Sequence, residues 1–244
     1  VSSILARGCI PVALELMDQA SVRLVEEFAH AGYPVDAGAV LLVEFEGLEH
    51  EVEAGAALAE SEGRRFGAEP RSAETDEERA RLWNGRKSIA GAIARAAPDY
   101  YLHDTVVPRT RLAGVLDQVL RIGEDESVII VNVAHAGDGN LHPLILFDGK
   151  EPGVLERVFR AGTRIVQVTV EAGGVLSGEH GIGLEKRDFL YSPAVMAPEE
   201  LDIHTRLRAA LEPTGFANPG KKIVARPAGD IGPTPSLVPE GTWL

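Results

Sequence analysis

The chain has 244 residues, a formal net charge of −13 and a pI near 5.0. That length suits one large domain or two small ones, and an acidic surface argues against binding to the phosphate backbone of nucleic acids. The single cysteine excludes an internal disulfide and favours a reducing compartment, so we expect a cytoplasmic protein, either free or peripheral at a membrane. No apolar run approaches the ~20 residues that a membrane-spanning helix needs.

The N-terminal part of the chain alternates between strand and helix patterns. Short apolar runs bounded by glycine or proline predict strands, and apolar residues spaced three or four apart predict helices. Thr75 and Glu78 form a capping-box pair and predict a long helix that Pro98 ends. We expect strands at 10–17, 40–45 and 64–70, and helices at 18–31, 48–63 and 75–97.

The second part reads β-α-β-β-α and then ends in a helix. Its expected strands are 100–107, 128–133 and 144–147, and its expected helices are 109–123, 153–172 and 198–211. Repeated β-α-β units with antiparallel pairing predict an α+β fold. We expect a duplicated ferredoxin-like plait, an antiparallel sheet with helices on one face, a C-terminal helical segment and an extended tail over 227–244.

The stretch His135-Ala-Gly-Asp-Gly-Asn-Leu-His142 is the first chemical motif. Gly and Asn between two apolar runs are typical of a hairpin turn, which would bring His135 and His142 to one mouth. Two imidazoles and one carboxylate are a common ligand set for a divalent metal ion. Asp138 and Asn140 either form the turn only or accept hydrogen bonds from the imidazoles.

A second motif, Ser177-Gly-Glu-His-Gly-Ile-Gly183, follows the helix-breaking pair Gly173-Gly174. Its glycines indicate tight bends or the close approach of another group. Glu179 is the candidate third ligand for zinc or a similar divalent ion. Two other interpretations stay open at this point: a metal-dependent hydrolase, which uses the same ligands, and a non-catalytic α+β binding domain.

The two motifs, with Asn218-Pro-Gly-Lys221 near the end, resemble the C-terminal (cap) domain of FAD-linked oxidases of the glycolate oxidase subunit, D-lactate dehydrogenase and D-2-hydroxyglutarate dehydrogenase type. The resemblance extends from about Pro11 to Ile223, and we assign residues 1–226 to this domain. It implies that FAD is bound mainly by an N-terminal domain absent from this chain, so the chain alone should be inactive.

The resemblance also implies roles for single residues. Trp83 and Arg86 match a family pattern in which the arginine holds the substrate carboxylate. His180 would act as the general base on the hydroxyl group of a 2-hydroxy acid, whose hydride passes to FAD. Asn218 and Lys221 would lie near the flavin.

The chain departs from the hydroxyglutarate enzymes at two places. It has no lysine beside Asp104, and it carries Leu144 where those enzymes carry asparagine. Both departures favour a small monocarboxylate, such as glycolate or D-lactate. The expected partners are this substrate, an FAD-binding domain, an electron-acceptor subunit and a second copy in a homodimer. Lys186 and Arg187 are expected to be solvated.

Overall fold

The computed structural model describes residues 1–192 and 194–223, so the predicted tail over 227–244 lies outside the described residues. The chain divides into two compact units, Val1–Gly174 and Val175–Leu244. In the part of the chain that the structure describes, no helix combines the length and apolar character that crossing a membrane requires.

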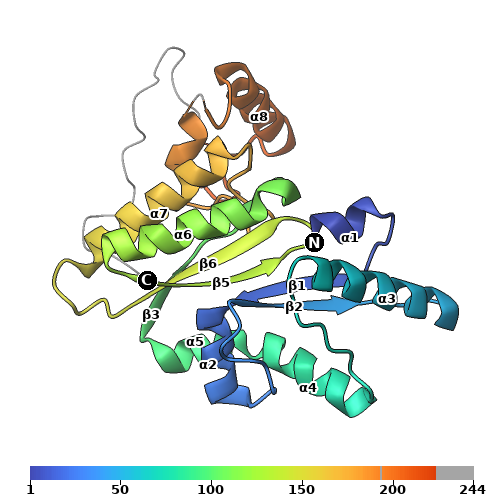
Figure 1. Ribbon diagram of the computed structural model, residues 1–244. Helices are drawn as coiled ribbons and strands as arrows, with labels where there is room; N and C mark the ends of the chain where they lie inside the picture. Colours follow the sequence, from blue (N-terminus) through green and yellow to red (C-terminus); the bar gives the residue numbers. More distant parts are fainter. Residues whose placement is uncertain (193, 224–244) are drawn as a thin grey trace. The chain divides into compact units, whose positions relative to one another are not determined.

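A six-stranded antiparallel sheet forms the centre of the first unit (Figure 1). The strand order is β2-β1-β5-β6-β3, and the short strand β4 pairs with another part of β6. The strands are β1 (Ala13–Asp18), β2 (Ala39–Glu44), β3 (Asp99–Leu102), β4 (Thr105–Val106), β5 (Ile129–His135) and β6 (Asn140–Phe147).

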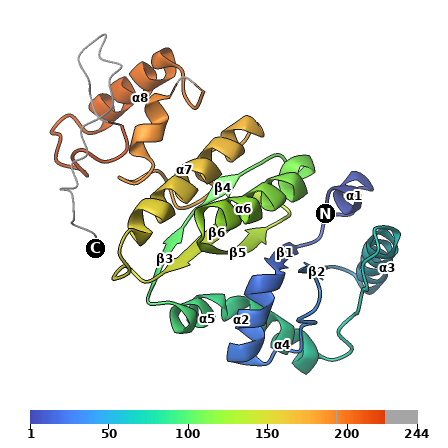
Figure 2. The same cartoon turned by 60° about the vertical axis from the view of Figure 1, so that its left-hand side comes forward.

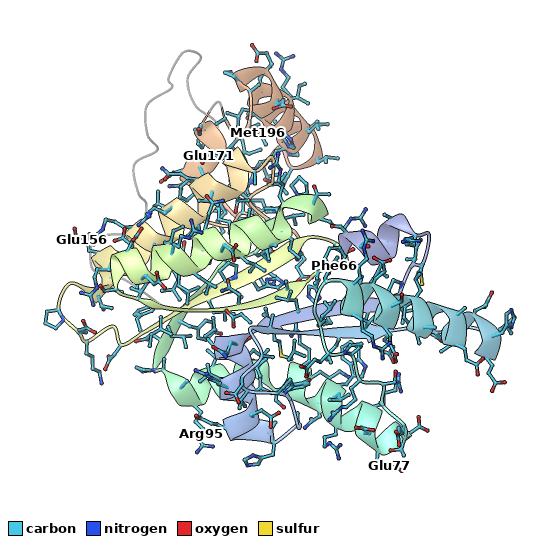
Figure 3. The ribbon with its side chains drawn as sticks, in the orientation of Figure 1. Phe66, Glu77, Arg95, Glu156, Glu171 and Met196 are labelled. Carbon is cyan, nitrogen blue, oxygen red and sulfur yellow. The ribbon has the colours of Figure 1, made fainter. Side chains whose placement is uncertain are left out.

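Helices cover both faces of this sheet, as two views of the ribbon show (Figures 1 and 2). Alternate residues of β5 divide between two apolar clusters. Ile130 and Ala134 pack with helices α6 and α7, whereas Val131 and Val133 pack with α2 and α5. Figure 3 labels Glu156 and Glu171 near the two ends of α7. The helices of this unit are α1 (Ser2–Ala6), α2 (Gln19–Ala29), α3 (Glu49–Arg65), α4 (Asp76–Lys87), α5 (Ile89–Ala96), α6 (Leu112–Glu126) and α7 (Val154–Glu171), with a 3-10 turn η1 at Arg109–Arg111.

The predicted α+β class with an antiparallel sheet is confirmed, and two details of the prediction need correction: the helices on one face only and the duplicated plait. Helices lie on both faces because the central strands are apolar on both sides, and each side needs a cover. The segment from β3 to α7 follows the plait order, with β6 between β3 and β5. The N-terminal half does not repeat that order, because β1 and β2 pair directly.

Three predicted elements of the first unit differ in the structure. The strand expected at 100–107 is divided into β3 and β4. The strand expected at 64–70 is wrong, since α3 continues to Arg65 and no strand follows among residues 66–75. The single helix expected over 75–97 is divided at Ser88 into α4 and α5. Its predicted start is confirmed, because the backbone N–H of Glu78 donates to Thr75 Oγ1 at 3.1 Å.

The second unit contains a 3-10 segment, η2 (Arg187–Tyr191), and helix α8 (Pro198–Leu211) among its described residues. Helix α8 has the bounds that the sequence predicts, and it supplies the expected C-terminal helical segment. Pro198 at its first position and Glu199 and Glu200 in its first turn favour this start, because the helix N-terminus attracts negative charge and does not need the N–H that proline lacks.

Candidate functional site

The predicted hairpin joins β5 to β6 through residues 136–139. The N–H of Asp138 donates to the carbonyl of His135 at 3.1 Å, and Gly139 has a φ of 76°. A Cβ at Gly139 would lie 2.2 Å from the carbonyl oxygen of Val107, so both the backbone angle and the space require glycine. Asp138 is exposed, and its backbone closes the turn.

The hairpin brings the two imidazoles together, as predicted. The ring centroids of His135 and His142 lie 5.3 Å apart with the rings at 89°, and a nitrogen of each ring lies within 4.8 Å of the other. His142 pairs with Val133, two residues before His135, so both side chains stand on one face of the sheet. His142 is buried and His135 is partly exposed. This separation suits two ligands of one ion.

Glu15 is a site residue that the sequence reasoning missed. Its Oε1 lies 2.7 Å from Nδ1 of His135, which faces it in the pairing of β1 with β5. Its Oε2 lies 2.9 Å from Nη2 of Arg86. A carboxylate inside the apolar run Ala-Leu-Glu-Leu-Met was the available signal, because a charge on a sheet face needs a partner.

Arg86 reaches the sheet from the last turn of α4. Helix α4 can lie close to Ala31 and Tyr33 because it has a glycine, Gly85, at the point of contact. A Cβ at Gly85 would lie 2.5 Å from the Cβ of Ala31 and 2.7 Å from the ring of Tyr33. Burial, the largest cause, raises the pKa of Tyr33 to about 12. Within the described part of the chain, Nε of Arg86 is buried and has no hydrogen-bond partner, so this edge of the guanidinium can still donate to an acceptor.

Further polar groups surround His142 within the first unit. Asp104 is fully buried, and one of its carboxylate oxygens lies within 4.8 Å of a ring nitrogen of His142. Asn140, which faces His135 across the hairpin, is also buried, and its Oδ1 accepts no hydrogen bond from the residues that the structure describes. The face of the sheet at this end is therefore polar, although the strands are otherwise apolar.

The glycine-rich loop lies in the second unit. Nε2 of His180 is 3.5 Å from Oε1 of Glu179, and these side chains are 45% and 52% exposed, respectively. The N–H of Gly181 donates to Ser177 Oγ at 2.6 Å, and Gly181 and Gly183 have φ values of 83° and 58°. The loop presents a carboxylate and an imidazole side by side. The ligand role of Glu179 and the base role of His180 stay predictions.

The Asn218–Lys221 stretch lies beside this loop within the second unit. The N–H of Lys222 donates to the carbonyl of Gly183 at 2.9 Å, and Asn218 adopts a left-handed φ of 46°. Arg208 on α8 donates to the carbonyls of Asn218 and Lys221 at 3.0 Å and 3.2 Å. These contacts hold the stretch against α8, and the flavin contacts of Asn218 and Lys221 stay predictions.

The expectation that Lys186 and Arg187 are solvated is wrong, because both are buried. Nη1 of Arg187 donates to the carbonyl of Gly220 at 2.9 Å. A guanidinium carries five donors, and this one satisfies a carbonyl of the turn after Asn218 instead of facing water. A buried arginine directly after a glycine-rich loop is hard to tell from a solvated one by sequence alone.

The family model described as FAD linked oxidases, C-terminal domain, matches residues 1–222. The chain therefore belongs to this family. It is 44% identical over 224 residues to the glycolate oxidase subunit GlcD of Escherichia coli (strain K12), which covers 91% of this chain and 44% of that protein. It is 36% identical to the subunit of the same name from Bacillus subtilis (strain 168), covering 91% of this chain and 47% of that protein.

A third relative is the D-lactate dehydrogenase of Archaeoglobus fulgidus, 30% identical over 89% of this chain and 47% of that protein. The chain thus spans less than half the length of these relatives. Among solved structures it is similar to 4-ethylphenol oxidase from Gulosibacter chungangensis, with a TM-score of 0.60 and 16% identity over 88% of this chain and 48% of that chain. At that identity the likeness concerns the fold alone.

Proposed function

We propose that this chain is the substrate-binding (cap) part of a flavin-dependent oxidoreductase that oxidises a small D-2-hydroxy acid, glycolate or a D-lactate-like acid, to the 2-oxo acid. Membership of the family and the names of the relatives support this proposal. The observation that carries it is the pair His135 and His142 with Arg86 nearby, joined through Glu15. Together these groups offer metal ligands and a carboxylate-binding cation in one place.

The flavin belongs mainly to a domain outside these residues, as the resemblance implies. Two facts support this: the chain spans less than half of its relatives, and its sequence has no Gly-rich dinucleotide fingerprint. Bound FAD supplies the acceptor for the hydride. Asn218 and Lys221 are the residues of this chain proposed to contact it.

A divalent cation, zinc or a similar ion, would be held by His135 and His142, with Glu179 as the third ligand. The residues fit such an ion: the two ring nitrogens lie within 4.8 Å of each other, and Nδ1 of His135 faces the carboxylate of Glu15, a partner that orients a ligand imidazole. The ion would polarise the substrate hydroxyl and lower its pKa.

The side chains of this chain then divide the work on the substrate. Arg86 binds the carboxylate, because a guanidinium forms two parallel hydrogen bonds with a carboxylate and its buried Nε has a free donor among the described groups. His180 takes the hydroxyl proton on a ring nitrogen, since histidine is the side chain that most often serves as a general base.

The size of the proposed substrate follows from the face of β6. Leu144 stands two residues after His142 on the same face and packs in the apolar cluster with α2 and α5. An apolar side chain there offers nothing to a second carboxylate. This supports a monocarboxylate, in agreement with the names of the glycolate and D-lactate relatives.

Electrons would leave the flavin to a further subunit. The relatives from Escherichia coli and Bacillus subtilis are named as glycolate oxidase subunits, which supports a role within an assembly. A homodimer stays a prediction.

The test is turnover by the FAD-loaded protein that contains this chain, with an artificial electron acceptor. We expect oxidation of glycolate or D-lactate, little oxidation of D-2-hydroxyglutarate, and none by the isolated chain. The variant Arg86→Lys should raise the KM, since an ammonium lacks the planar fork. Failure of the FAD-loaded protein to oxidise any of these acids in the presence of the acceptor would contradict the proposal.

A further inference from the structure

Glu15 stands between the two halves of the proposed site in the first unit. One carboxylate oxygen faces Nδ1 of His135 at 2.7 Å, and the other faces Nη2 of Arg86 at 2.9 Å. The side chains of Glu15 and Arg86 are only 13% and 12% exposed. A charge so far removed from water needs partners, and here both oxygens face a donor.

Regular structure fixes this arrangement. Glu15 is directly opposite His135 in the antiparallel pairing of β1 with β5, so backbone hydrogen bonds set the distance between the two side chains. Its neighbours Leu14 and Leu16 point to the other face, where they pack with the cluster under α6 and α7. Arg86 comes from α4, which packs closely against Ala31 and Tyr33 at the neighbouring Gly85.

We infer that Glu15 is a positioning residue that prepares His135 for metal binding and anchors Arg86 for the substrate carboxylate. The inference rests on the proposed function for the metal and the substrate, but not for the state of His135 itself. A carboxylate opposite Nδ1 keeps the proton on that nitrogen, so Nε2 carries the lone pair.

The second oxygen has a different task. Its contact with Nη2 of Arg86 is an ion pair outside hydrogen-bond geometry, because Oε2 accepts no hydrogen bond from the described residues. The guanidinium is held electrostatically, and its Nε donor is left for another acceptor. Because one carboxylate holds both groups, a change at Glu15 should affect metal binding and substrate binding together.

The chain offers a matched control. Glu44 on the neighbouring strand β2 pairs with Arg79, also on α4. The variants Glu15→Gln and Glu44→Gln each remove one strand-to-α4 ion pair at nearly constant volume. Only Glu15→Gln should change the state of His135 and the binding of metal and substrate. An effect that arises only because α4 is held less firmly would appear in both variants.

The first readout is ¹⁵N NMR of histidine side chains in the metal-free chain. We expect the Nδ1–H form of His135 in the wild type and in Glu44→Gln, and a shift toward a mixture of the two neutral forms in Glu15→Gln. An Nε2–H form of His135 in the wild type would overturn the inference, whether or not the protein binds a metal.

The second readout is titration of the metal-free chain with Zn²⁺. Loss of a group that orients a ligand histidine costs about 10–100-fold in metal affinity, so we expect that loss in Glu15→Gln and none in Glu44→Gln.

The third readout is the KM for the 2-hydroxy acid in the FAD-loaded protein, which should rise in Glu15→Gln more than in Glu44→Gln. Wild-type Zn²⁺ affinity and KM in Glu15→Gln would overturn the inference. A wild type that binds no Zn²⁺ but has the Nδ1–H form would refute the proposed metal site, and of the inference only the control of the His135 tautomer by Glu15 would stand.

Discussion

The two regions that carry the candidate site residues are built in different ways. In the first unit, His142 lies on β6 and is buried, and Glu15 and His135 lie on paired strands that set their separation. In the second unit, Glu179 and His180 lie in a loop with glycines at positive φ, and about half of each side chain is exposed.

This difference has a physical consequence. Residues on a packed sheet contribute to folding and to the site at the same time, so their replacement changes both. Residues in an exposed loop make few packing contacts, so their replacement should change function while stability stays nearly constant. Each of the following predictions tests or sharpens this contrast, from the largest expected change in stability to the smallest.

The largest change in stability is expected in the apolar cluster between the sheet and helices α6 and α7. Ile145 is fully buried on β6 in the cluster with α6 and α7. Ile145→Ala should lower the free energy of unfolding by about 2–5 kcal/mol, because apolar burial is lost and a cavity is left. Urea denaturation measures this loss. Ile203 on α8 of the second unit is 56% exposed, and Ile203→Ala should cost less than about 0.5 kcal/mol. Equal losses in the two variants would contradict the contrast.

A smaller effect is expected where α4 meets Tyr33. Gly85→Ala places a methyl group 2.5 Å from the Cβ of Ala31, so α4 must move away from Ala31 and Tyr33. We expect a loss of about 1–3 kcal/mol from overpacking and a higher KM, because Arg86 moves with the helix. Gly114 on α6 has open space around its Cβ position. Gly114→Ala should stabilise by about 0.5–1 kcal/mol through helix propensity and leave the KM unchanged. A normal KM in Gly85→Ala would show that the position of Arg86 does not depend on this contact.

The network between α6 and α7 gives a pH-dependent effect. Hydrogen bonds from Arg160, the largest cause, and from Arg164 hold the pKa of Glu126 below its usual value of 4.5. A carboxylate whose folded-state pKa is lowered stabilises the fold above its unfolded pKa, and this contribution is lost as the pH falls through the folded value.

Glu126→Gln should therefore cost up to about 1 kcal/mol near neutral pH, and the difference from the wild type should shrink as the solution becomes acidic. The control is Glu156→Gln, because Glu156 also pairs with Arg160 but is largely exposed. Thermal melts across a pH series measure both. A difference that grows on acidification would have the wrong sign for this account.

The smallest change in stability is expected in the loop of the second unit. Glu179→Ala should shift the free energy of unfolding by less than about 0.5 kcal/mol in the presence of a chelator, because the side chain is 52% exposed. The same variant should lose bound metal. Melting curves with and without added Zn²⁺ separate these effects, since a ligand that binds only the folded state raises the melting temperature. A large loss of stability in the chelated protein would show that Glu179 supports the fold.

The sequence predicts the hairpin and its two histidines because their signals are local. Gly139 must adopt a positive φ, and alternating apolar residues fix which side of the strand His142 faces. The N-cap at Thr75 is also predictable, because its hydrogen bond joins residues only three positions apart, Thr75 and Glu78. The loop at 177–183 has no periodic pattern, so its candidate site residues are found through the family motif.

The errors involve contacts between distant parts of the chain. Glu15 was missed because its two partners lie far away in sequence, on β5 and on α4. The prediction of a strand at 64–70 is wrong because α3 continues through Arg65. Helix propensity and the salt bridge of Arg65 with Glu62 favour the helix there. The sequence does not reveal that Arg187 is buried, because the carbonyl that it binds belongs to Gly220, 33 residues further along the chain.

The most direct test of the central claim is the metal content of the purified protein, measured by elemental analysis for the wild type and for His142→Ala. The account predicts about one divalent ion per chain in the wild type after incubation with Zn²⁺ and removal of excess, and a large loss in the variant, because His142 is proposed as one of three ligands. A wild type that retains no ion, or a variant that retains as much as the wild type, would contradict it.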